Sequence, residues 1–187
     1  MKDFARIVLI SALAAVSLSG CAMWHSTINY IRADSASTCP DAAILATTST
    51  LPAFDPAKGS DPSGILYTAK MTDVKTRCDF SKRDFTADSN LKIFITATRP
   101  PGGLEANYRV PYYIAVTNNG DIVDKQVFWA EFEFPEGATS VNFRHDVDSF
   151  EVAVGKQKRA YEFHLLIGFQ LTKAQLEFNK KMGQYAP

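Results

Sequence analysis

The sequence predicts an all-β protein: an antiparallel β-sandwich, Ig-like in general form, that ends in a short helix. About seven segments alternate apolar and polar residues as half-buried strands do, and turn-forming residues separate them roughly every ten residues. Thirteen phenylalanines and seven tyrosines also favour strands over helices. Strand and helix patterns do not alternate, so a parallel sheet is not expected. A small open barrel is the alternative architecture.

The expected strands begin after residue 38, and clusters of Pro, Gly and polar residues set their ends. Pro52 ends the first strand, and residues 79–90 are expected to form a polar connection. Asn118-Asn119-Gly120-Asp121 predicts a tight hairpin, because Asn-Gly tolerates the positive φ angles of a type I′ turn. The expected strands cover residues 42–51, 65–78, 91–98, 110–116, 122–134, 141–154 and 161–169.

Two of these segments carry more detailed predictions. In residues 122–134, Phe and Ala occupy the even positions from 128 to 134, while Trp129, Glu131 and Glu133 share the opposite face. In residues 141–154 the apolar positions change from odd to even near Asp148-Ser149. A bulge at that point keeps both apolar sets facing the core.

The C-terminal helix is expected over residues 172–183. Thr172 is a suitable N-cap, and Gln175 three positions later completes a capping box. Two lysines in the last turn suit the helix dipole, and Gly183 suits the residue that follows a helix.

The first 20 residues read as an export signal and not as part of the sandwich. Lys2 and Arg6 provide a basic start, and residues 7–18 form an apolar run broken by two serines. This run is too short to span a membrane, because a spanning helix needs about 20 apolar residues. The segment closes with small residues before a cysteine, in the order Leu18-Ser19-Gly20-Cys21.

Leu18-Ser19-Gly20-Cys21 resembles the lipobox of bacterial lipoproteins. The resemblance implies lipid attachment to the Cys21 sulfur, cleavage before Cys21 and acylation of the new amino terminus. Two or more acyl chains anchor a protein firmly to a membrane. Because Ala22 and not aspartate follows the cysteine, the family's sorting pattern implies the periplasmic face of the outer membrane over the inner membrane. An uncleaved signal with an incidental cysteine is the alternative.

Residues 21–38 are expected to be a tether, and residues 39–187 a single domain that includes the terminal helix. Trp24, Ile28 and Ile31 fall on one helical face that suits a membrane interface, although a loose linker is the favoured interpretation. In this layout the chain resembles small proteobacterial envelope lipoproteins. That resemblance carries no functional residues.

Cys39 and Cys78 are the two cysteines left after Cys21, and we expect them to form a disulfide in an oxidising compartment. The chain-entropy model gives such a bond roughly 4 kcal/mol of stabilisation for a loop of about 40 residues. A metal site is not expected at these cysteines, because no histidine pair with ligand spacing lies near them.

No motif for catalysis is found, and the protein is not expected to be an enzyme or to need a cofactor. On a strand, His145 points away from Asp146 and Asp148, which disfavours an acid–base pair. Asp146 and Asp148 lack the glycine loop of a calcium site. Glu131 and Glu133 beside Trp129 suit carbohydrate, but a solvated sheet face is favoured.

The candidate binding surface lies where cations, a rigid turn and aromatic residues meet. Arg99 precedes a Pro-Pro-Gly-Gly turn, and loops at the end of a sandwich often carry binding residues. A simple connection with core tyrosines is the alternative. The residues of the candidate surface are Arg99, Arg109, Tyr112, Tyr113 and Trp129.

Charge excludes one class of partner. Without residues 1–20 the chain has 18 basic and 19 acidic residues, and it has no basic cluster of the kind that binds nucleic acid. We therefore expect an envelope adaptor or assembly component, held at the membrane by lipid, that binds another envelope protein. A ligand-binding module for carbohydrate or an apolar molecule is the alternative.

Overall fold

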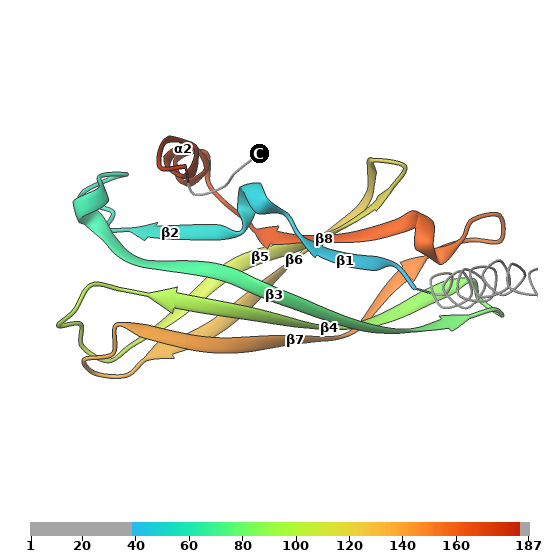
Figure 1. Ribbon diagram of the computed structural model, residues 1–187, viewed down its shortest axis with the longest axis horizontal. Helices are drawn as coiled ribbons and strands as arrows, with labels where there is room; N and C mark the ends of the chain where they lie inside the picture. Colours follow the sequence, from blue (N-terminus) through green and yellow to red (C-terminus); the bar gives the residue numbers. More distant parts are fainter. Residues whose placement is uncertain (1–38, 184–187) are drawn as a thin grey trace, which may run out of the picture. The chain divides into compact units, whose positions relative to one another are not determined.

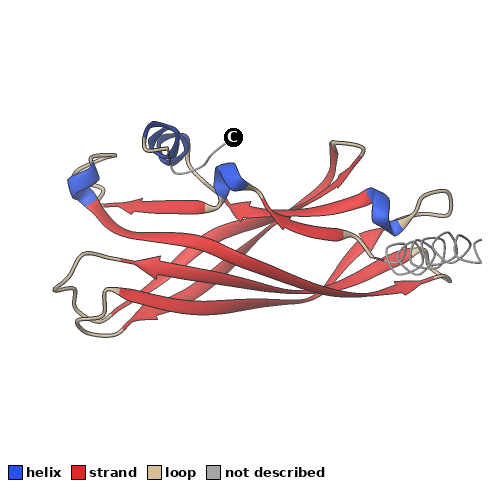
Figure 2. Cartoon of the chain, viewed as in Figure 1, coloured by secondary structure: helices blue, strands red, loops and turns tan. Residues whose placement is uncertain are grey.

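The computed structural model describes residues 39–183, which form two four-stranded sheets packed face to face (Figures 1 and 2). One sheet has the order β1-β8-β5-β6 and the other β2-β3-β4-β7. The antiparallel β-sandwich with a short C-terminal helix is therefore confirmed. The strands are β1 (Asp41–Ile44), β2 (Thr50–Phe54), β3 (Ile65–Ser81), β4 (Thr86–Thr98), β5 (Ala106–Asn118), β6 (Asp121–Phe134), β7 (Ser140–Ala153) and β8 (Phe163–Phe169).

The core lies between the sheets and is filled by the apolar positions of both. In β6 the expected alternation is present, because Ala130, Phe132 and Phe134 are buried while Glu131 and Glu133 are exposed. Rings from the two sheets meet directly: the Phe132 and Phe143 rings stack with their centres 4.7 Å apart. Burying a side chain of this size contributes about 1.5–3 kcal/mol.

The first expected strand is in fact two strands, one in each sheet. After β1 the chain makes a short 3-10 turn, η1 (Ala46–Thr48), and crosses to the other sheet as β2. Pro52 does not end this strand but lies inside β2, paired with Thr68. Proline is tolerated there because β2 is an edge strand with one side free of ladder bonds.

Parallel pairing occurs at one place in the otherwise antiparallel sandwich. β1 runs parallel to β8, with Asp41 opposite His164 and Ile44 opposite Ile167. β1 and β8 lie far apart in the sequence and are not joined as a strand–helix–strand unit. No local pattern therefore predicts their pairing. The remaining strand pairs are antiparallel.

Residues 79–90 form the end of a long hairpin, so the expected connection is wrong. β3 and β4 stay paired from Thr68 opposite Thr98 to Ser81 opposite Thr86. The segment looks polar because its outward positions are charged, while Ala87 and Ser89 are fully buried between them. A sheet with one solvated face produces this mixture.

Two local predictions in the strands are confirmed. Asn119 and Gly120 have φ angles of 54° and 88°, as a type I′ hairpin turn requires. In β7 the pairing jumps from Val147 opposite Leu91 to Phe150 opposite Ser89, which marks a bulge at residues 148–149. The backbone N–H of Ser149 donates to Asn90 Oδ1 at 3.2 Å.

The helix α2 (Lys173–Lys181) is present with the expected capping box. The Gln175 N–H donates to Thr172 Oγ1 at 3.3 Å, and the Thr172 N–H donates to Gln175 Oε1 at 2.8 Å. Gly183 follows the helix at a φ angle of 61°. None of the helices within residues 39–183 is long and apolar enough to span a membrane.

Candidate functional site

The loop between β4 and β5 lies at the end of the sandwich opposite the start of β1 (Figure 1). Arg99, its first residue, is 9% exposed and does not project into solvent. Its guanidinium lies 4.6 Å from the centre of the Phe134 ring. It also donates hydrogen bonds to the carbonyl oxygens of Leu104, Gly103 (3.0 Å), Pro135 (2.8 Å) and Ala138 (2.8 Å).

Arg99 therefore joins its own loop to the loop between β6 and β7. Arg99 also lines the groove in front of this loop, although backbone carbonyls of the two loops already accept hydrogen bonds from its guanidinium. Gly103 makes this clamp possible. A Cβ at that position would lie 2.6 Å from Arg99 Cζ, so any other residue would displace the guanidinium from this position.

An apolar groove lies in front of this clamped loop. It has a volume of about 410 Å³ and runs between the loop and the first residues of β3 and β5. Leu104 is 75% exposed and Leu66 is 43% exposed. The side chains that line the groove are mostly apolar, and two are charged: Ile65, Leu66, Pro100, Pro101, Leu104, Ala106 and Tyr108, with Arg99 and Glu105. We call this feature the loop groove.

The two tyrosines of the candidate surface are buried, so they do not belong to an exposed binding surface. Tyr112 is fully buried between the sheets, where its ring stacks on Phe128 at 5.4 Å. Tyr113 points to the outer side of the sheet but is covered there. Its hydroxyl lies 2.9 Å from Thr48 Oγ1, and Lys125 Nζ lies 4.4 Å from its ring centre.

Arg109 and Trp129 do lie together, on the outer face of β5 and β6. The guanidinium of Arg109 lies 4.5 Å from the centre of the Trp129 ring, and Arg109 Nε lies 3.6 Å from Glu131 Oε1. Trp129 is 46% exposed. The sequence placed Trp129 and Glu131 on one face and put Arg109 with Trp129 in the candidate surface, but it did not predict the contact between Arg109 and Glu131. The register of the hairpin, which sets Arg109 opposite Glu131, is the signal that finds it.

The histidine and carboxylates considered for catalysis are separated. The ring of His145 points into the sandwich and contacts Tyr112 edge to face at 5.4 Å. Asp146 lies on the outer face, where its Oδ1 is 2.8 Å from Arg144 Nε. Within residues 39–183, no group of three or more His, Cys, Asp or Glu side chains is placed to hold a metal ion.

Burial raises the pKa of two tyrosines in the core. The pKa of Tyr67 rises to about 12 through burial, and the neighbouring Tyr108 adds to the rise. Burial also raises the pKa of Tyr112 well above its ordinary value. Both shifts move the pKa of the phenol further above neutral pH, so neither tyrosine is suited to act as a general base near pH 7.

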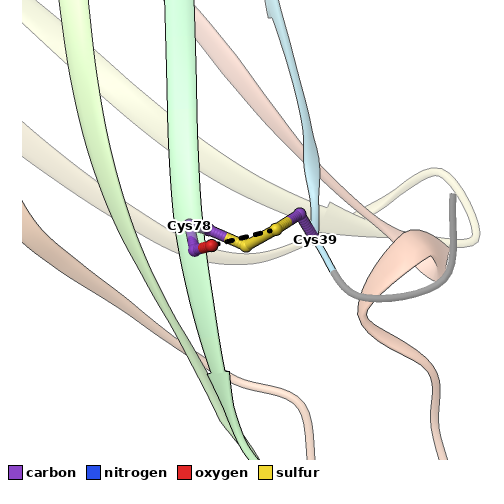
Figure 3. Close-up of a disulfide and its surroundings, with 2 residues drawn as sticks. All are labelled: Cys39 and Cys78. Atoms are coloured by element: carbon purple, nitrogen blue, oxygen red, sulfur yellow. Dashed lines mark hydrogen bonds between the residues drawn. A yellow bond between two sulfur atoms is a disulfide. The ribbon is translucent and has the colours of Figure 1, made fainter. Parts of the chain in front are cut away.

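The expected disulfide between Cys39 and Cys78 is present (Figure 3). Cys39 lies two residues before β1, and Cys78 lies in β3, with Cα atoms 5.9 Å apart. Since β1 and β3 belong to different sheets, the bond joins the two layers where the chain enters the sandwich. Cys21 lies outside the described residues.

Compared with protein-family models, curated proteins and solved structures, the chain matches none of them.

Proposed function

We propose that this protein is a lipid-anchored envelope protein without enzymatic activity, which binds another envelope protein as an adaptor or assembly component. The anchor is Cys21, and the favoured location is the periplasmic face of the outer membrane. The disulfide between Cys39 and Cys78 supports an oxidising compartment outside the cytoplasm.

The loop groove is the observation that supports protein binding. Single exposed leucines are common on protein surfaces, but here Leu66 and Leu104 adjoin two prolines and Tyr108 in one groove. The Arg99 clamp holds the loop in place before any partner arrives. A preformed surface loses less conformational freedom on binding, which favours affinity.

The position of the loop groove also suits an anchored adaptor. The described chain begins at one end of the sandwich, and the loop between β4 and β5, which lines the loop groove, lies at the other end (Figure 1). The loop groove therefore lies at the end of the sandwich away from the residue through which Cys21 is connected to it.

Carbohydrate binding is the second candidate function, and Trp129 is the observation that favours it. An exposed indole flanked by Arg109 and Glu131 offers an aromatic face with polar neighbours. However, the Arg109 guanidinium already covers one face of that indole. Calorimetric titration with soluble cell-wall oligosaccharides tests this function: saturable binding heat that Trp129→Ala abolishes would favour it.

Site-specific photo-crosslinking in intact cells tests the adaptor function. A photoreactive amino acid at Leu104 is expected to yield one discrete adduct with an envelope protein, and Leu66→Glu is expected to abolish that adduct. The matched control is the same amino acid at Glu151, an exposed position of β7 away from the groove. Equal adducts from both positions, or none from Leu104, would contradict the proposal.

The anchor has its own test, which is independent of the groove. Cys21→Ser is expected to release the protein from membranes or to leave an uncleaved precursor, and the mature wild-type protein should carry lipid mass. Unchanged fractionation together with an unmodified mass would exclude the anchor.

A further inference from the structure

Within residues 39–183, β6 is a long sheet edge that no other element covers, and the one irregularity in its pairing with β5, between Ile122 and Asp124, lies outside residues 125–131. The edge at β2 is covered by α2, and β1 has only four residues. The edge at β7 carries the bulge at Ser149 and the ion pair of Arg144 with Asp146. Bulges, short strands and covering helices block pairing with another chain, and charges block it unless the partner strand places an opposite charge across from them. β6 has 14 residues and no neighbouring strand on its outer side in this part of the chain.

The outer face of β6 has an ordered sequence of charge and apolar surface. Its successive outward positions are Lys125, Val127, Trp129 and Glu131, which lie opposite outward residues of β5. Val127 is 51% exposed and Trp129 is 46% exposed. Two exposed apolar side chains are thus flanked by a cation on one side and a carboxylate on the other. When a second copy of β6 runs antiparallel to the first, its charges and apolar residues therefore match those of the first copy.

We propose that β6 pairs antiparallel with β6 of a second copy of this chain, with Phe128 of each copy at the twofold axis. In this register Lys125 faces Glu131 of the other copy, and Val127 faces Trp129. The symmetry makes each of these pairs twice. Opposite charges and apolar residues placed directly across antiparallel strands stabilise the pairing. The four-stranded sheet that contains β6 in one copy then joins the same sheet of the other copy, and together they form one sheet of eight strands.

Neighbouring registers do not give this match. Moving the axis to residue 127 places Lys125 opposite Trp129, and moving it to residue 129 places Val127 opposite Glu131. The present contacts of the two charges leave them accessible. The Glu131 side chain is 77% exposed beside Arg109, and Lys125 donates to Gln170 Oε1 at 2.9 Å from an exposed position. The pairing does not use the loop groove, so it goes beyond the adaptor function.

Disulfide trapping tests the register. Val127→Cys and Trp129→Cys are introduced separately into the mature chain with Cys21→Ser, which keeps the native disulfide. Directly opposite residues come close enough for a disulfide, whereas diagonal ones do not. Mild oxidation is therefore expected to link the two variants when they are mixed and to link neither variant with itself. Self-linking without mixed linking, or a protein that stays monomeric in sedimentation, would overturn the proposal.

A charge exchange tests the same pairs in a second way. Lys125→Glu and Glu131→Lys are each expected to weaken the dimer by about tenfold or more, because two attractive pairs become repulsive. The double variant restores both pairs and should regain wild-type dimerisation. Lys92→Glu, an exposed change on the other sheet, is the matched control and should have no effect. A double variant as weak as the single variants would overturn the register, while adducts from Leu104 would be unaffected.

Discussion

At the scale of single residues, two adjacent tyrosines have opposite hydrogen-bonding states. The hydroxyl of Tyr112 is buried and has no hydrogen-bond partner among the described residues. The hydroxyl of Tyr113 lies 2.9 Å from Thr48 Oγ1. A buried polar group without a partner costs free energy, whereas a hydrogen-bonded one contributes about 1 kcal/mol.

Removing each hydroxyl should therefore have a different effect on stability. Tyr112→Phe is expected to leave the free energy of unfolding unchanged or to raise it by up to about 1 kcal/mol, because it deletes an unpaired group. Tyr113→Phe is expected to lower it by about 1 kcal/mol, because Thr48 loses its partner. Urea unfolding of both variants checks this. A larger loss for Tyr112→Phe than for Tyr113→Phe would contradict the assignment of the two hydroxyls.

Buried tyrosines also predict sensitivity to alkaline pH. The pKa of Tyr67 is raised from 10.0 to about 12 in the folded protein, so the unfolded chain loses this proton at lower pH. The stabilisation is complete below about pH 10 and is lost as the pH rises through about 12. Urea unfolding across this window should show falling stability, and Tyr67→Phe should show a smaller fall. An equal fall in both proteins would contradict this role for Tyr67.

The sequence predicted part of this residue-scale picture. The alternation of Val110, Tyr112 and Ile114 indicated that Tyr112 points inward, and it is fully buried. The cover over Tyr113 was not predictable, because it comes from Thr48 and Lys125 on separate elements. Arg99 is a similar case, since its acceptors belong to two loops that meet only in the folded protein.

At the scale of elements, α2 covers the edge of the sheet at β2. The side chain of Gln175 donates to the carbonyl oxygen of Pro52 at 2.7 Å, and Asn179 donates to that of Thr50 at 2.7 Å. Phe178 packs edge to face on Phe54, with ring centres 5.1 Å apart. Helix side chains thus take the place that another strand would occupy beside β2.

This arrangement predicts that Asn179 contributes more than a helix residue on the solvent side. Asn179→Ala should lower the free energy of unfolding by about 1–3 kcal/mol, because it leaves the buried Thr50 carbonyl without its donor. Lys180→Ala, the exposed neighbour, should change it by no more than about 0.5 kcal/mol. Thermal or urea unfolding measures both. Similar losses in the two variants would show that α2 does not protect this edge.

The ends of elements were predicted well where a local signal sets them. The capping box of Thr172 with Gln175, the Asn119-Gly120 turn and the phase change at Ser149 are all visible in short stretches of sequence. The division of the first strand into β1 and β2 has no such signal. It depends on which sheet each half joins, and that is a long-range pairing.

At the scale of the whole molecule, the disulfide between Cys39 and Cys78 links the two sheets. It closes a loop with a sequence separation of 39 residues. In the chain-entropy model a bond of this span stabilises the fold by about 4 kcal/mol, mainly by restricting the unfolded chain. The bond also holds the start of β1 against β3 at the end where the chain enters the sandwich.

A mutational cycle measures this contribution. Cys39→Ala and Cys78→Ala should each lower the free energy of unfolding by about 4 kcal/mol, and the double variant should lose no more than either one alone. The reason is that one missing sulfur already abolishes the bond. Losses that add up in the double variant would show that the two sulfurs act separately. Thiol labelling of the oxidised wild-type domain provides the control.

The sequence alone determined the fold class, the disulfide partners, the inward faces of the strands and the terminal helix. Each depends on local alternation, on a capping or turn signal, or on a count of cysteines, and none needs the path of the chain in space. Tertiary structure decided which strands pair, that β1 runs parallel to β8, and that Arg99 and Tyr112 are buried. It also decided that no other segment of residues 39–183 covers the loop groove or pairs with the outer edge of β6. These features arise from contacts between segments far apart in the chain, where local sequence carries no signal.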